Sequence, residues 1–255
     1  MILAIDIGNS NIVIGLFDKQ ALVSQYRVQT EKQKNEIHYA KTFSELIDKD
    51  LTKRIHGVIV GSVVPEIDDV IYKVINKQLK LAPLFASSEL KTNIKNLTQK
   101  PSELGADRLA DTVAAIELSR ENKIVVDLGT ATKFEVISAD DNYLGGAIAP
   151  GIGSSFTSLI SNASMLSDIK LSRPKKTVGG WSTKEHLDSG FILGFAGLVD
   201  GMTERIMEEK KWKNANVIVT GGYSDLITKH IRYPHVTNKN LILEGLYLLW
   251  KLNNT

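Results

Sequence analysis

Two stretches of the chain share one pattern, in which a hydrophobic strand runs into an Asp-x-Gly turn and then into small polar residues. The first reads DIGNSN at residues 6–11, and the second reads DLGTAT at residues 127–132. Glycine permits a tight turn and leaves room for a phosphate near the main chain, while amide and hydroxyl groups donate hydrogen bonds to phosphate oxygens. A plain hairpin needs the same residue types, but the repeat favours phosphate binding.

The two turns also offer carboxylates for cations. Mg²⁺ prefers one or two carboxylates together with phosphate oxygens, so Asp6 is a candidate magnesium ligand, and ion binding is the natural role of Asp127. The candidate phosphate ligands are Gly8, Asn9, Ser10 and Asn11 in the first turn, and Thr130 and Thr132 in the second.

An Asp–Arg pair lies in a third stretch, PSELGADRLAD at residues 101–111. A kinase that acts on an alcohol needs a carboxylate near the hydroxyl to orient it and accept its proton, and Asp107 lies off the apolar face of the helix expected here. The Arg108 guanidinium suits an acidic substrate, because it donates two parallel hydrogen bonds to a carboxylate. From spacing alone, however, a solvated ion pair is the favoured interpretation.

Three glycine-rich stretches supply further candidates. GGAIAPG at 145–151 predicts a strand edge with tight turns, either structural or lining a cleft, and VTGG at 219–222 suits a nucleotide at a helix N-terminus. In GFILGFAGLVDG, at 190–201, glycines recur every three or four residues on one helix face. Each glycine weakens a helix by about 1 kcal/mol, so this stripe predicts close packing, in the monomer core or at a subunit interface.

The composition and net charge of the 255-residue chain exclude several classes of function. There is no cysteine, which excludes disulfides and thiol catalysis, and the formal net charge of +2 gives no argument for nucleic acid or an anionic membrane as a partner. The five histidines are scattered, so a His-rich metal site is not expected. No signal peptide or membrane-spanning segment is expected either, and we expect a cytoplasmic protein.

Apolar periodicity orders the chain into alternating strands and helices. The expected strands are 2–7, 11–17, 21–28, 56–64, 83–86, 123–128, 132–138, 143–149, 216–222 and a short strand before the last helix. The expected helices are 36–50, 65–80, 102–121 with Ser102 as its N-cap, 153–163, 183–210, 224–231 and 240–252.

The two halves of this order share one plan, with three strands followed by alternating helices and strands. The period is nearly half the chain, which indicates duplication and not a solenoid, whose repeats are far shorter. We therefore predict an α/β protein of two ribonuclease-H-like βββαβαβα domains that face each other across a cleft, as in actin-like ATPases. The predicted domains are residues 1–101 and 102–255.

The ordered motifs closely resemble those of the type III pantothenate kinases over essentially the whole chain. They are DIGNSN, PSELGADR, DLGTAT, GGAIAPG, GGWST and VTGG. The resemblance implies the actin-like fold and a homodimer with its active sites at the interface. It also implies transfer of the γ-phosphate of ATP to pantothenate, giving 4'-phosphopantothenate in the first step of coenzyme A biosynthesis, with Mg²⁺ and a monovalent cation, K⁺ or NH₄⁺.

The same resemblance implies a role for individual residues. Asp107 matches the general base, Arg108 the residue that grips the pantothenate carboxylate, and Asp127 the ligand of the monovalent cation. The other matches are Gly105 and Ala106 in the substrate pocket, Thr183 toward the substrate of the partner subunit, Asp6, Gly8, Asn9 and Ser10 in the first phosphate turn, and Gly129, Thr130, Ala131 and Thr132 in the second.

Four positions depart from the pattern of the family. Asn93 replaces a glycine but still tolerates the left-handed conformation, Thr98 replaces a common aromatic residue of the substrate pocket, and Ser182 replaces a common asparagine. Lys133 stands where the family commonly has threonine. If its amine reached the cation site, it would supply a built-in charge in place of K⁺, but we expect this side chain to point to solvent.

Three other functions are compatible with these patterns. The first is a kinase for another small acidic alcohol, the second a non-catalytic regulator of the same fold that binds nucleotide, and the third a ribonuclease-H-like nuclease. The polar turns and the nearly balanced charge count against the nuclease. The kinase hypothesis is favoured by four intact residues, which are Asp6, Asp107, Arg108 and Asp127.

Overall fold

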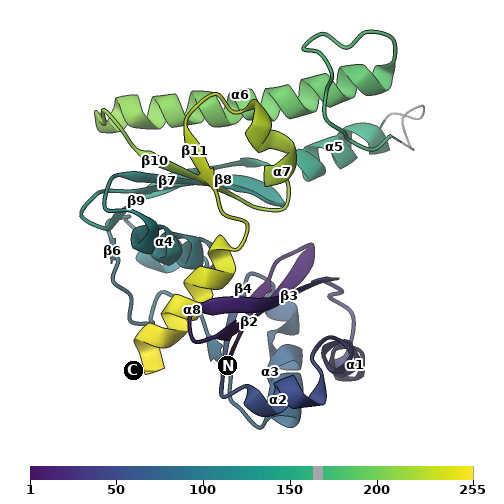
Figure 1. Cartoon of the computed structure of the whole chain (residues 1–255), viewed down its shortest axis with the longest axis vertical. Helices are drawn as coiled ribbons and strands as arrows, with labels where there is room; N and C mark the ends of the chain where they lie inside the picture. The colour runs from purple at the N-terminus through teal and green to yellow at the C-terminus, as the bar shows by residue number, and fades with distance from the viewer. Residues whose placement is uncertain (163–168, 255) are drawn as a thin grey trace. The chain divides into compact units, whose positions relative to one another are not determined.

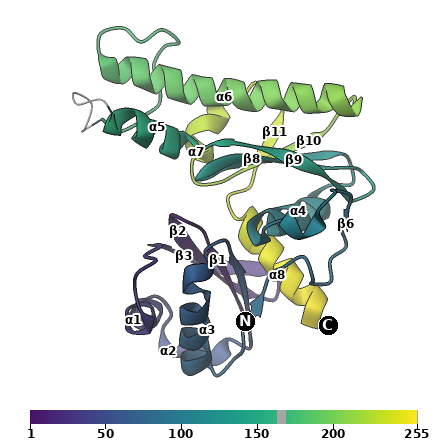
Figure 2. The ribbon, with the colours of Figure 1, turned by 180° about the vertical axis from the view of Figure 1, so that it is seen from behind.

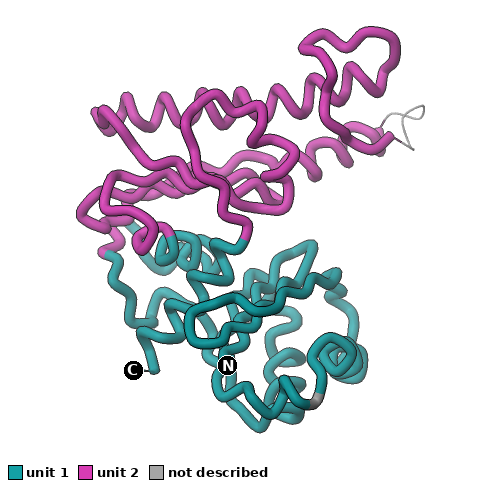
Figure 3. The backbone as a smooth tube through the Cα atoms, in the orientation of Figure 1, with its two compact units in different colours: residues 1–94, 99–114, 240–255 teal, residues 95–98, 115–239 magenta. Residues whose placement is uncertain are grey.

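The computed structural model describes residues 1–162 and 169–254, in two compact units (Figure 3). Unit 1 comprises residues 1–94, 99–114 and 240–254, and unit 2 comprises residues 95–98 and 115–239. The predicted fold class, an α/β protein with two sheets, is confirmed. The last residue of the helix predicted at 153–163 lies outside the described residues.

Unit 1 is built on a five-stranded sheet with the order β3-β2-β1-β4-β5. β1 is antiparallel to β2 but parallel to β4. The sequences of β1 and β4 are almost continuously apolar, because helices cover both faces of these strands. The strands are β1 (Ile2–Ile7), β2 (Asn11–Asp18), β3 (Ala21–Gln29), β4 (Gly57–Ser62) and β5 (Leu84–Phe85).

Helices α1 and α3 cover one face of this sheet, with a core that contains Tyr39, Phe43 and Ile71 (Figure 1, Figure 2). The predicted helix 36–50 is in fact two helices, because Asp48 caps a new one by accepting hydrogen bonds from the main chain of Asp50 and Leu51. The helices are α1 (Glu36–Leu46), α2 (Lys49–Arg54) and α3 (Pro65–Leu79).

The other face of the first sheet is covered by α8 (Leu241–Asn254), the last helix of the chain. Glycines on the strands make room for its large side chains. A Cβ would come within 2.9 Å of Leu243 at Gly15, 2.8 Å of Leu246 at Gly61, and 2.4 Å of Trp250 at Gly57. The units therefore differ from the predicted division at residue 101/102, since the C-terminal helix belongs to the first unit.

Unit 2 contains a six-stranded sheet with the order β11-β10-β7-β8-β9-β6. Its strands are β6 (Lys95–Asn96), β7 (Lys123–Leu128), β8 (Ala131–Ile137), β9 (Asn142–Pro150), β10 (Asn216–Thr220) and β11 (His235–Thr237). Sequence reasoning missed β6, which pairs with β9 in a stretch that reads as polar and irregular.

Helix α6 (Thr183–Lys210) runs across one face of the second sheet, where Ile192, Ala196 and Val199 join its core (Figure 1). The same face is covered by α5 (Ile152–Ser161) and by α7 (Ser224–Ile227), which continues into the 3₁₀ turn η2 (Thr228–His230). The predicted helix from Ser102 instead consists of a 3₁₀ turn, η1 (Pro101–Glu103), followed by α4 (Ala106–Leu118).

Candidate active site

The first Asp-x-Gly turn joins β1 to β2 and is held by its own main chain and by Thr30. The Gly8 N–H donates to the Asn11 carbonyl at 3.0 Å, the Thr30 hydroxyl donates to the Gly8 carbonyl at 2.7 Å, and the Thr30 N–H donates to the Ser10 carbonyl at 3.1 Å. These bonds fix the shape of the turn and leave Asn9 and Ser10 at the surface. The turn thus presents amide and hydroxyl groups on a rigid support.

Asp6 stands at the end of β1, partly buried, with Val13 opposite on β2 and Gly61 beside it on β4. Strand alternation puts its side chain on the α8 face of the sheet, where Gly61 contributes no side chain. A carboxylate in this position, next to exposed oxygen-bearing side chains, fits the hard oxygen ligands that Mg²⁺ requires.

Asp107 lies in the first turn of α4, and its carboxylate folds back over the start of the helix. A Cβ on Gly105 would come within 2.9 Å of Asp107 Oδ1, so the glycine makes room for this conformation. The Gly105 carbonyl accepts the first helical hydrogen bond, from the Leu109 N–H at 2.9 Å. Arg108 is partly buried beside Asp107.

Ala106 is buried, with 5% of its surface exposed. Its methyl group is therefore mostly covered by other residues, and its predicted place in the substrate pocket stays a prediction. The structure places Asp6, Gly105, Asp107 and Arg108 in the same unit.

One acidic residue of unit 1 was missed by sequence reasoning. Asp68 lies in the first turn of α3, near Ser62 at the end of β4, and is partly buried. Burial raises its pKa, while a hydrogen bond with Ser62 acts in the opposite direction. Its Oδ1 has no hydrogen-bond partner among the described residues. Nothing in the periodicity of α3 distinguishes Asp68 from an ordinary N-terminal acid.

The second Asp-x-Gly turn joins β7 to β8 and contains an ion pair. Asp127 and Lys133 are directly opposite each other in the antiparallel ladder. Lys133 Nζ lies 2.7 Å from Asp127 Oδ2, and only 13% and 14% of the lysine and aspartate side chains are exposed. The prediction that Lys133 points to solvent was therefore wrong, because the register of the hairpin brings it to the carboxylate.

Glycines from two other motifs lie in close contact with this turn. Gly221, of VTGG, has φ 93°, and a Cβ there would lie 2.5 Å from Asp127 Oδ1. Gly151, which ends GGAIAPG, approaches so closely that a Cβ would lie 2.3 Å from the Thr130 carbonyl. Ser154 on α5 donates to the same carbonyl at 2.8 Å. The two glycine-rich stretches thus shape the turn that carries Asp127.

Thr132 does not lie with the other polar side chains of the turn. It is fully buried, and strand alternation puts it on the same face as Phe134, opposite to Lys133. Its Oγ1 has no hydrogen-bond partner within the described part of the chain. We therefore correct the prediction that this hydroxyl binds phosphate. Thr130, in contrast, is exposed at the tip of the turn.

Replacing Thr132 with valine is expected to raise the free energy of unfolding by about 1 kcal/mol, because a buried hydroxyl without a partner gives way to a methyl group of similar size. Urea unfolding of both proteins measures the difference. Kinase activity should be unchanged. A variant that folds normally but loses activity would show that the hydroxyl does contact phosphate.

Thr183 is the first residue of α6 and is exposed. The side chain of Ser182 caps the helix by accepting from the Glu185 N–H, and Glu185 in turn accepts from the main chain of Gly180 and Trp181. The bonds from Trp181 and Gly180 lower the pKa of Glu185. Serine in place of the common asparagine therefore keeps the cap intact. The cap fixes the first turn of α6, and with it the main chain of Thr183.

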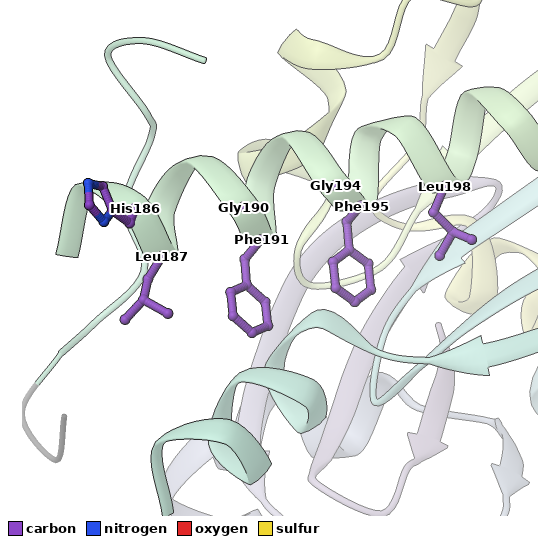
Figure 4. A pocket seen from close by; sticks show the side chains of 7 residues that line it. All are labelled: His186, Leu187, Gly190, Phe191, Gly194, Phe195 and Leu198. Atoms are coloured by element: carbon purple, nitrogen blue, oxygen red, sulfur yellow. The ribbon is translucent and has the colours of Figure 1, made fainter. Parts of the chain in front are cut away.

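The glycine stripe of α6 faces outward. Within residues 1–162 and 169–254, a Cβ at Gly190, Gly194 or Gly197 would meet nothing within 4 Å, so packing against the described core does not explain these glycines. Beside them lies an apolar groove of about 290 Å³, and the described residues that line it all belong to α6 (Figure 4). Its side chains are His186, Leu187, Phe191, Phe195 and Leu198.

Residues 1–162 and 169–254 contain neither a cluster of metal-binding side chains nor a membrane-spanning helix. No three histidine, aspartate or glutamate side chains gather closely enough to hold a metal ion on protein ligands alone. No helix in these ranges combines the length and the apolar character needed to cross a membrane.

Comparison with solved structures identifies the fold. The chain matches a polyphosphate/ATP-glucomannokinase from Arthrobacter with a TM-score of 0.54, at 16% identity over 98% of both chains. It matches component A of (R)-2-hydroxyglutaryl-CoA dehydratase from Acidaminococcus fermentans with a TM-score of 0.57, at 13% identity over 98% of this chain and 95% of the other. At these identities the likeness concerns the fold alone, which is that of the actin-like ATPases.

Sequence comparison then identifies the family. The family model of type III pantothenate kinase matches residues 2–205. Type III pantothenate kinases from Finegoldia magna and Desulfatibacillum aliphaticivorans are each 38% identical to this chain, over 99% and 98% of it and 98% of each relative. The chain belongs to the type III pantothenate kinase family, which confirms the predicted resemblance.

Proposed function

We propose that this protein transfers the γ-phosphate of ATP to the primary hydroxyl of pantothenate, forming 4'-phosphopantothenate in the first step of coenzyme A biosynthesis. The observation that carries the proposal is the family match over residues 2–205, together with relatives of that name that align over nearly the whole chain. Both Asp-x-Gly turns and the Asp107–Arg108 pair are present in the aligned region.

In this proposal Asp107 orients the hydroxyl of pantothenate and accepts its proton as the oxygen attacks the phosphorus. The position of its carboxylate above Gly105, at the start of α4, supports this role. Arg108 binds the pantothenate carboxylate, since a guanidinium forms two parallel hydrogen bonds with it. Gly105 lines the substrate pocket.

The phosphates of ATP are proposed to bind the exposed parts of both turns. These are Gly8, Asn9, Ser10 and Asn11 in the first turn, and Gly129, Thr130 and Ala131 together with the main chain of Thr132 in the second. Asp6 would hold Mg²⁺, which when bound neutralises charge on the phosphate oxygens. The carboxylate of Asp127, expected to bind a monovalent cation, is already paired with Lys133, so that cation does not fit and has no part in the mechanism.

A coupled assay for ADP release tests the proposal. The protein is mixed with ATP and Mg²⁺, and pantothenate is then added. Release of ADP that depends on pantothenate is the expected result, with 4'-phosphopantothenate identified by mass spectrometry. ADP release with a different hydroxy acid alone would favour a kinase for another acidic alcohol, and nucleotide binding without turnover would favour a regulator.

We propose further that the protein is a homodimer that pairs through α6, with Thr183 near the substrate of the partner subunit. The support is the exposed face of α6, where glycines with open space above them adjoin an apolar groove. Small residues let two helices approach closely, and a large apolar patch seldom remains exposed in a monomer. The remaining partners are small molecules, and the proposed reaction takes place in the cytoplasm, where ATP is available.

Replacing Gly194 with arginine is expected to dissociate the dimer, because a long charged side chain would separate the paired helices. The variant should fold, since a Cβ at this position meets nothing within 4 Å in the part of the chain that the structure describes. Sedimentation velocity measures the oligomeric state. Ala139→Arg, which adds the same charge at an exposed turn of the same unit, is the control and should remain dimeric. A Gly194→Arg dimer would place the interface elsewhere.

A further inference from the structure

Asp127 and Lys133 form an ion pair at the second Asp-x-Gly turn. We propose that the Lys133 ammonium is a fixed cation of the active site, which takes the place of a bound monovalent cation, so that phosphoryl transfer requires neither K⁺ nor NH₄⁺. The inference rests on the proposed kinase function.

The position of the ammonium is determined by the hairpin. Asp127 on β7 and Lys133 on β8 are paired residues of the antiparallel ladder, and their side chains project from the same face of the sheet. A slip of one residue would move Lys133 to the opposite face, where its neighbours Thr132 and Phe134 are buried. The geometry of the strands therefore holds the charge beside Asp127.

The ion pair is shielded from water on most sides. The exposed fractions of 13% and 14% contrast with those of Lys239 and Asp225, an ion pair of the same unit in which 56% and 66% are exposed. Salt and water screen a partly buried pair less than a surface pair. Lys133 is thus a stable structural charge, whereas Lys239 is a solvated one.

The surroundings of Asp127 do not suit a second cation. Oδ2 accepts from Lys133, and Oδ1 lies beneath Gly221, where a Cβ would be only 2.5 Å away. A metal cation bound to this carboxylate would lie within a few ångströms of the ammonium, and like charges at that distance repel strongly. The carboxylate is therefore engaged with an internal cation.

The Lys133 ammonium belongs to the residue that directly follows the turn proposed to bind phosphate. Lys133 follows the turn directly, and the tip of the turn carries the exposed Thr130. A lysine ammonium is a compact point charge with three donors, and it serves phosphate oxygens in other nucleotide sites. Asp127 then acts as a positioning residue, because it orients the ammonium without contacting the reacting atoms.

The first test measures the rate of pantothenate phosphorylation in NaCl, KCl, NH₄Cl and tetramethylammonium chloride at constant ionic strength. The wild type is expected to have the same rate in all four. Lys133→Thr should lose about 10²-fold or more in Na⁺, a loss typical of removing one electrostatic stabiliser, and should recover activity in K⁺ or NH₄⁺. Lys239→Thr, which removes the exposed pair, should behave as the wild type does.

A second readout does not depend on turnover. Thallium(I), an NMR-visible substitute for K⁺, is titrated into each protein in the presence of a non-hydrolysable ATP analogue. Lys133→Thr is expected to bind Tl⁺ and to melt at a higher temperature as K⁺ increases, because a ligand that binds only the folded state stabilises it. The wild type and Lys133→Arg should show neither effect.

The outcomes separate this inference from the function on which it rests. A wild type that requires K⁺, or that binds Tl⁺ at the nucleotide site, overturns the inference, even if Lys133→Thr fails to fold. A wild type without pantothenate-dependent ADP in any salt overturns the proposed substrate, and the Tl⁺ titration then still decides whether Lys133 excludes the cation.

Discussion

Replacing Asp107 with asparagine is expected to lower kcat by about 10²-fold or more, which is typical for the loss of a general base. The amide is nearly the same size as the carboxylate, so it should still fit above Gly105, where the present oxygen lies. It cannot accept the proton of the pantothenate hydroxyl. The affinity for pantothenate should change little, because Arg108 is assigned to bind the substrate carboxylate. Steady-state kinetics and calorimetric titration with pantothenate measure the two effects separately.

The matched control for this variant is Glu103→Gln, which converts a nearby acid to its amide. Glu103 is exposed and forms an ion pair with Lys100 at 2.9 Å, so its loss should leave kcat unchanged. If Asp107→Asn retained the kcat of the wild type, another group would have to accept the proton. A uniform loss of pantothenate affinity with normal kcat would instead assign Asp107 to substrate binding.

Replacing Gly221 with alanine is expected to lower the free energy of unfolding by about 2–4 kcal/mol, through backbone strain and overpacking together. With φ at 93°, the residue occupies a conformation that side chains other than glycine rarely adopt. The added methyl group would also lie 2.5 Å from Asp127 Oδ1 and from the main chain of Leu128. Urea unfolding measures the loss of stability, and an activity assay under folding conditions measures the effect on catalysis.

Gly180→Ala is the control, because among the described residues a Cβ there meets only Glu185 Oε2, at an ordinary 3.4 Å. Surface substitutions of this kind change stability by about 0.5 kcal/mol or less. If Gly221→Ala is as stable as the wild type, the close approach to Asp127 does not constrain this turn. If it remains folded but loses activity, displacement of Asp127 and Lys133 would account for the loss.

The order of elements could largely be read from the sequence. Buried strands such as β1, β4 and β7 are continuous apolar runs, and the Asp-x-Gly turns mark their ends, so local pattern and observed structure agree. Two of the predicted helices are interrupted in the structure, and both interruptions have local causes. Asp48 starts a new helix inside the segment predicted as one, and α4 begins after a 3₁₀ turn at Pro101–Glu103.

The sequence by itself determined the repeat, the two polar turns, the family and the residues that carry the proposed chemistry, because residue type and order suffice for these. Only the tertiary structure decided which side chains meet. It placed α8 on the first sheet, turned the glycines of α6 outward, buried the hydroxyl of Thr132 and brought Lys133 to Asp127. The physical reason is that strand register and helix packing depend on contacts between residues far apart in the chain, which local patterns do not contain.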